Sequence, residues 1–303
     1  LEEALASEKV SNGDTLNLAP GTYLHTDELQ VAKSVTIQGD GTGEVILKRE
    51  RQPHKTSPSK SSWYNPGDRL EDKGLYSIRI TGDNVTFRGV TLGGWDKERT
   101  AYGWVLGIGG ENCLLEEVAF PGLNIRSAVV VIAETSGLTI KKCVFSGGYY
   151  EAAIRGGTTN LTLEENLFEE RHWYGGPLHF DDLFPISGAI RYNFFVHTTG
   201  NTDNETSFNQ SGVGMDAIGI HTSKLAGKLL VQHNTFSWES SGEINKYGFS
   251  AQATALHVKE FPGLDASRLD IRDNIFSGYQ TVDNDPAGSR APETNYEGWR
   301  DGA

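Results

Sequence analysis

A short pattern recurs along the chain, and it restricts the possible folds more than any other feature. Each copy has apolar residues at alternate positions, then one fixed position, and an apolar residue two places later; the sharpest copy is Leu161–Phe168. The fixed position is held by Asn166, Asn193, Asn234 and Asn274, and in three upstream copies by Val90, Val118 and Cys143. Phe stands two places later in six of the seven copies, at Phe120, Phe145, Phe168, Phe195, Phe236 and Phe276.

The spacing of these copies predicts a solenoid built from strands. Successive fixed positions are 28, 25, 23, 27, 41 and 40 residues apart, the range in which stacked repeats are found. Alternation of apolar residues is typical of a strand with one buried face. A buried Asn needs partners for its amide, and an identical Asn about 4.8 Å above and below supplies them. We therefore predict that the Asn residues form a structural ladder and that the Phe residues stack in the core.

A continuous repeat predicts one elongated domain that covers residues 1–303. Within it we expect an amphipathic capping helix in residues 1–12, coils over residues 13–278, and a tail or C-terminal cover over residues 279–303. Three polar or irregular stretches interrupt the pattern, and we expect them to be long loops: residues 48–73, 198–214 and 239–252. The last two would form a wall on one side of the solenoid.

Charge and composition narrow the class of partner. The net charge of −13 argues against a nucleic acid, and no stretch is apolar and long enough to predict a membrane span. The two cysteines, Cys113 and Cys143, stand at different places in the repeat, so we expect two buried thiols and no disulfide. We expect a monomer.

The first coils resemble a known group of enzymes. The segments GDTLNLAPGTY and VTIQGDGTGEVIL, followed by repeated N-x-F strands, are similar to the entry of the right-handed parallel β-helix in pectate lyases, alginate lyases and related carbohydrate-active enzymes. The resemblance extends over roughly residues 13–278. It implies an all-β, right-handed parallel β-helix that is secreted or periplasmic and acts on an acidic polysaccharide.

A cluster of polar residues is predicted on the strand that precedes each ladder strand. When the apolar residues of these strands are placed inward, alternate residues point outward. The outward residues of four successive coils are Arg155, His179, Asp181, His221, His257 and Lys259. The equivalent upstream positions, which we assign as Gly107, Ile132 and Ala153, carry no reactive group.

These residue types suit elimination from a uronic acid, in which a base removes the C5 proton and an acid protonates the leaving oxygen. We predict that Arg155 and Lys259 neutralise the carboxylate and that Asp181 orients a histidine. The base would be His221 or Lys246, and the acid Tyr247 or His179. For sugar contacts we add His257 and a basic aromatic segment that contains Arg171, Trp173 and Tyr174.

Two other functions are open from sequence. A glycoside hydrolase on the same scaffold would use Asp181, Asp182 and Asp216 as acid and base. A non-catalytic carbohydrate-binding or tailspike-like module would use the cluster as contact surface only. The same three carboxylates could bind Ca²⁺, although no spacing identifies a metal site.

Overall fold

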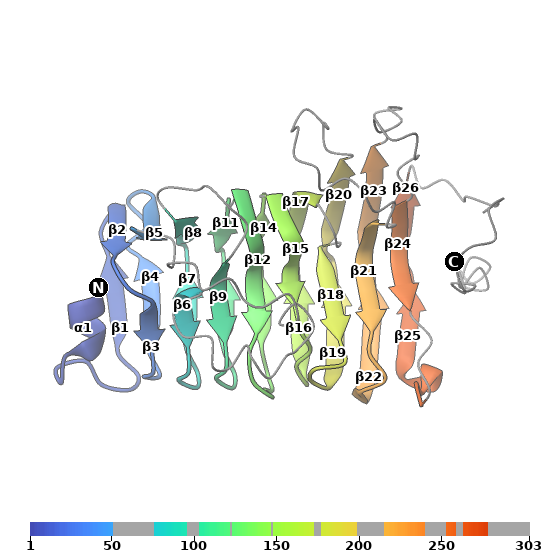
Figure 1. Ribbon diagram of the computed structural model, residues 1–303, viewed down its shortest axis with the longest axis horizontal. Helices are drawn as coiled ribbons and strands as arrows, with labels where there is room; N and C mark the ends of the chain where they lie inside the picture. Colours follow the sequence, from blue (N-terminus) through green and yellow to red (C-terminus); the bar gives the residue numbers. More distant parts are fainter. Residues whose placement is uncertain are drawn as a thin grey trace.

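The computed structural model describes residues 1–50, 76–95, 103–121, 123–146, 148–172, 177–198, 215–239, 253–258 and 263–277. Its strands stack into a parallel β-helix that runs from α1 at one end to β26 at the other (Figure 1). This confirms the all-β fold class predicted from the repeat. The expected loops lie mostly outside the described residues, and the tail over residues 279–303 lies wholly outside them, so the domain boundaries stay predictions.

Each coil contributes one strand in turn to three sheets, which we call A, B and C, except the last described coil, which has strands in A and B only. Sheet A consists of β1 (Thr15–Leu18), β4 (Thr36–Gly39), β7 (Thr86–Arg88), β10 (Leu114–Glu116), β13 (Thr139–Lys141), β16 (Leu161–Glu164), β19 (Ile186–Arg191), β22 (Leu225–Gln232) and β25 (Leu269–Arg272).

Sheet B follows sheet A in every coil and carries the Phe positions. It consists of β2 (Gly21–His25), β5 (Val45–Arg49), β8 (Thr91–Trp95), β11 (Ala119–Phe120), β14 (Val144–Phe145), β17 (Leu167–His172), β20 (Phe194–Thr198), β23 (Thr235–Glu239) and β26 (Ile275–Ser277).

Sheet C completes each coil and carries the predicted polar cluster. It consists of β3 (Leu29–Val31), β6 (Tyr76–Ile80), β9 (Trp104–Ile108), β12 (Leu123–Val131), β15 (Gly148–Arg155), β18 (Leu178–Asp181), β21 (Met215–His221) and β24 (Ala253–Val258). Sheets B and C join where β15 pairs with β17.

Helical structure is scarce in the described part of the chain. The helix α1 (Glu2–Ala6) is shorter than expected and buries Leu5 against the first coils, which confirms the predicted amphipathic cap. Lys33 holds this end of the chain by donating hydrogen bonds to the carbonyls of Ser7 and Val10. A 3₁₀ turn, Ala266–Arg268, precedes β25. None of the described helices is long and apolar enough to cross a membrane.

The Phe residues stack inside sheet B as predicted. Neighbouring rings from Phe120 to Phe236 are buried, 4.7 to 4.8 Å apart and within 5° of parallel. Phe276 continues the stack at 5.1 Å but is 52% exposed, so its predicted place in the core was wrong. This spacing is the separation of adjacent strands, so the backbone register fixes the ring contacts. Cys113 and Cys143 are free and buried, as predicted, and burial raises the pKa of Cys143 to about 12.

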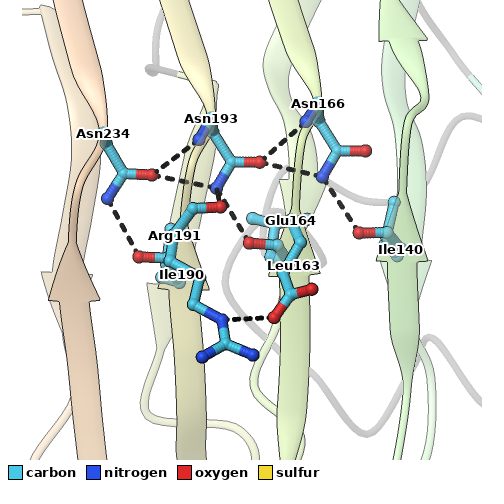
Figure 2. Close-up of polar contacts among 8 residues, drawn as sticks. All are labelled: Ile140, Leu163, Glu164, Asn166, Ile190, Arg191, Asn193 and Asn234. Carbon is cyan, nitrogen blue, oxygen red and sulfur yellow. Dashed lines mark hydrogen bonds and ion pairs between the residues drawn. The ribbon is translucent and has the colours of Figure 1, made fainter.

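The Asn ladder joins the coils at the turn from sheet A to sheet B (Figure 2). The amide Oδ1 of Asn193 accepts hydrogen bonds from both the backbone N–H and the Nδ2 of Asn166, and Asn234 does the same for Asn193. Each Nδ2 also donates to a carbonyl of the preceding coil, such as Leu163 for Asn193. At its upstream end Asn166 accepts from the N–H of Cys143. The buried amides are therefore satisfied, which confirms the predicted ladder.

The residue before each ladder position has a left-handed backbone, which the repeat pattern did not reveal. The φ angle is between +54° and +58° at Glu117, Lys142, Glu165, Tyr192, His233 and Asp273. Residues other than Gly adopt this conformation at a cost of roughly 1–2 kcal/mol each. The left-handed turn is followed by a buried side chain, and its hydrogen bonds where it is Asn, or its apolar packing where it is Val118 or Cys143, offset that cost.

Replacing Asn193 with Ala should lower the free energy of unfolding by about 1–3 kcal/mol, because the change leaves the N–H of Asn166 and the carbonyl of Leu163 without their buried partner. Chemical denaturation followed by circular dichroism would measure it. Asn17→Ala is the matched control, since Asn17 is exposed and accepts one hydrogen bond from Gln38. Equal effects of the two substitutions would contradict a structural ladder.

A buried histidine lies near the N-terminal end, at the corner between sheets B and C. The Nδ1 of His25 lies 2.7 Å from the Asp27 carbonyl, and its Nε2 lies 3.3 Å from the Ser77 hydroxyl. Arg49, also buried, donates to the carbonyls of Thr26 and Tyr76. Burial lowers the pKa of His25 and Arg49 lowers it further, while the bond to Asp27 and the charge of Glu2 oppose the shift.

Stability should therefore fall as the pH is lowered below the ordinary histidine pKa of about 6.5. In that range the unfolded chain binds a proton on His25 that the folded chain resists, so protonation favours unfolding. Thermal unfolding of the wild type and of His25→Asn across this range should show a shallower pH dependence in the variant. The exposed His233→Gln should retain the wild-type dependence; identical curves for wild type and His25→Asn would refute the assignment.

Candidate functional site

The polar cluster predicted from sequence lies on the outer face of sheet C. Backbone pairing places Arg155 opposite His179, His179 opposite Gly219, and Gly219 opposite His257. Asp181 is opposite His221 in the next outward column. Alternate residues of the same strands, such as Leu178 and Ile218, are fully buried in the core, so strand geometry directs the polar side chains outward.

An ion pair at this surface joins two neighbouring coils. The Nε of Arg155 lies 3.1 Å from Oδ2 of Asp181, and the two side chains are 13% and 19% exposed. Oδ1 of Asp181 accepts a hydrogen bond from the N–H of Leu183, which fixes the carboxylate at the end of β18. The carboxylate therefore holds one edge of the guanidinium in place, and charge-assisted bonds of this kind are stronger than neutral ones.

Two imidazole rings converge beside the ion pair. The ring centres of His179 and His221 are 4.7 Å apart and the ring planes are 74° from parallel. Gly219 lies in the backbone between them. A Cβ atom built on Gly219 would be 3.4 Å from Nε2 of His221 and 3.6 Å from Nδ1 of His179. Both ring nitrogens thus lie at van der Waals distance from the place where a side chain at the buried Gly219 would begin.

The structure brings together four of the predicted site residues: Arg155, His179, Asp181 and His221. His257 is next in register through its backbone, and Arg171 lies in β17, where it pairs with Gly148. The remaining predicted residues lie outside the described part of the chain; they are Trp173, Tyr174, Lys246, Tyr247 and Lys259. The roles assigned to all of them remain predictions.

The upstream alignment predicted from sequence was partly wrong. Gly107 does occupy the column of Arg155, but the neighbouring positions are Arg79 and Val130 rather than Ile132 and Ala153. The register of β12 against β15 shifts twice between Leu123 and Ser127. The two shifts cancel before Val130, so they do not cause the error: Val130 and Arg155 each lie 12 residues after their ladder positions, Val118 and Cys143, and the predicted Ile132 and Ala153 were each two residues away from these places.

Asp181 and Asp182, two of the carboxylates predicted for a hydrolase or a calcium site, each bind a different part of the protein. Oδ1 of Asp182 lies 2.7 Å from the N–H of Ser223 and 3.2 Å from its hydroxyl, so Asp182 stabilises the turn of the next coil. Asp181 is engaged with Arg155. The described residues contain no group of three side chains suited to hold a metal ion. The side chain of Asp216 is not among those described.

Comparison with known proteins assigns the fold family. The family described as Rhamnogalacturonase A/epimerase, pectate lyase-like matches residues 1–175. The chain belongs to this family. Its members are carbohydrate-active and include lyases, hydrolases and epimerases. The match covers Arg155 and ends before His179, Asp181 and His221. No curated protein sequence matches the chain.

Solved structures resemble the chain only distantly. A pectin methylesterase from Aspergillus niger is 13% identical over 97% of this chain and 86% of that chain, with a TM-score of 0.43. An alginate lyase from Paenibacillus sp. str. FPU-7 is 14% identical over 92% of this chain and 95% of that chain, with a TM-score of 0.40. Likenesses at this level carry no argument about activity.

Gly219 offers a test of the site that leaves its charged groups unchanged. Gly219→Leu should reduce ligand binding or turnover strongly, because the new side chain fills the space bordered by the two imidazoles. Gly219→Ala is the control, since its Cβ would make only ordinary contacts of 3.4 and 3.6 Å. Thermal unfolding would verify that both variants fold. A fully active Gly219→Leu variant would place the site elsewhere.

Proposed function

We propose that the protein is a secreted or periplasmic polysaccharide lyase that cleaves a uronic-acid polymer by β-elimination, with alginate as the first candidate and pectate as the second. The observation that carries this proposal is the convergence of His179 and His221 beside the Arg155–Asp181 ion pair on the outer face of sheet C. Membership of a carbohydrate-active family supports a polysaccharide as the substrate.

Elimination requires three functions, and each has a candidate in the cluster. A cation must neutralise the substrate carboxylate so that the C5 proton becomes acidic. Arg155 suits this role because its guanidinium is a permanent cation suited to bidentate binding of a carboxylate, and because it lies partly exposed on the outer face of sheet C. The observed partner of Asp181 is Arg155, so we assign Asp181 the role of positioning the guanidinium. Whether Asp181 also orients His221, which it faces across the strands, stays a prediction.

In this proposal the two histidines transfer the protons. Imidazole has an unperturbed pKa that permits it to accept or donate a proton near neutral pH. In the proposed reaction His221 removes the C5 proton, the electrons of that bond form the C4–C5 double bond, and the C4–O bond breaks. His179 donates a proton to the leaving oxygen. Lys246 as base and Tyr247 as acid are the alternatives for these two steps, and Lys259 is a second candidate cation.

The hydrolase alternative has weaker support because Asp181 and Asp182 hold different parts of the protein, Arg155 in one case and the turn at Ser223 in the other. A glycosidase needs two carboxyl groups that flank one glycosidic bond. The binding-module alternative predicts ligand binding without bond cleavage.

Product chemistry separates these functions. The purified chain would be incubated with alginate, polygalacturonate, glucuronan and a neutral glucan while ultraviolet absorbance reports the conjugated C4–C5 double bond. We expect absorbance to rise on one of the uronates. New reducing ends without absorbance would favour a hydrolase, and binding without either signal would favour a binding module.

On the substrate that responds, His221→Gln and His179→Gln should each lower the turnover rate by about 10²–10⁴-fold, the usual contribution of a positioned acid or base. His233→Gln, at the corner between sheets A and B, is the matched control and should retain activity. Full activity in either site variant would remove that histidine from the mechanism.

A further inference from the structure

Upstream of the candidate site, an apolar cluster lies on the outer face of sheet C beside Arg79. Tyr76, Trp104, Val130 and Ile132 pack together separately from the main core. The rings of Tyr76 and Trp104 stack with their centres 5.3 Å apart. Each of the four residues is at most 2% exposed although Val130 occupies the same outward column as Arg155. Solvent therefore barely reaches these four side chains.

Gly107 shows how completely the upstream face is occupied. It shares a column with Val130 and Arg155, and like Gly219 it has no side chain. A Cβ built on Gly107 would come within 2.9 Å of the Tyr76 ring and within 3.3 Å of Ile132. Protein side chains thus fill the space above Gly107. A Cβ on Gly219, by contrast, would make only ordinary contacts, the nearest at 3.4 Å to the His221 ring.

The solvent exposure of the outer face of sheet C changes from one coil to the next. Val130 is fully buried, whereas Arg155, His179, Asp181 and His221 on the next three strands are all partly exposed. From β15 to β24 the sheet face extends over three strand intervals of about 4.8 Å, or about 14 Å, a length comparable with about three pyranose units. A polymer lying along this face would meet the apolar cluster immediately beyond Arg155.

We infer that the site binds the end of a uronate chain and releases short oligouronides, because the upstream face is closed to a chain that would pass through it. This inference rests on the proposed lyase function and adds to it the mode of action. The terminal sugar would stop where the closed face over Val130 and the Tyr76–Trp104 pair begins, while the remainder of the chain leaves toward β24.

The number of chain ends provides a direct test. A uronate polymer that responds in the absorbance assay would be fragmented chemically into samples of equal mass and decreasing length. At equal subsaturating mass, the initial rate should rise in proportion to the number of ends, and the first products should be short oligouronides of uniform size. Solution viscosity should fall slowly relative to the number of double bonds formed. His221→Gln would provide the background rate.

Two other outcomes have separate meanings. A rate that is independent of chain length, with an early loss of viscosity and products of mixed size, would overturn the inference while leaving the lyase function intact. No absorbance on any uronate would instead refute the proposed function, and the chain-end inference would fall with it.

Discussion

Parallel hydrogen bonding between successive coils is the constraint on which the rest of this structure depends. It sets equivalent residues of successive coils about 4.8 Å apart, so their side chains lie above one another in a column and must be compatible with their neighbours. Phe rings in one column must stack, and charged residues in one column must face each other. The outer face of sheet A shows the latter: Glu116 is paired with Arg88 at 2.7 Å and with Lys141 at 2.8 Å, its neighbours in register.

The Asn ladder adds a second set of bonds where the main-chain pairing of sheets A and B is interrupted. At this corner the backbone turns through a left-handed residue, and the peptide groups would otherwise lose partners in the interior. Side-chain amides replace those partners from coil to coil. The ladder begins at Cys143, whose N–H it satisfies, and Val90 and Val118 hold the position upstream. The corner is therefore held by amide bonds in one half of the described solenoid and by apolar packing in the other.

Because equivalent residues stack in columns, sheet C has two different outer surfaces along its length. Over β6, β9 and the end of β12 a buried apolar cluster lies beside Arg79, which pairs with Glu28. Over β15, β18 and β21, Arg155 and the histidines form a partly exposed polar surface. A rigid scaffold holds these groups at fixed separations, which lowers the entropic cost of positioning a substrate. In the function we propose, the boundary between the two surfaces determines both where catalysis occurs and which part of a polymer can reach it.

The sequence by itself determined the solenoid, the ladder at Asn166, Asn193 and Asn234, the Phe stack and the two buried thiols, because each is a local pattern that repeats at the spacing of the coils. It also identified Arg155, His179, Asp181 and His221 as neighbours, since strand alternation and coil order suffice to place them on one face. Only the tertiary structure decided that Asp181 pairs with Arg155, that Asp182 instead holds the turn at Ser223, and that Val130 stands in the column of Arg155. The first two facts depend on side-chain direction at strand ends, which leaves no periodic signal in the chain, and the third is fixed by the pairing of β12 with β15.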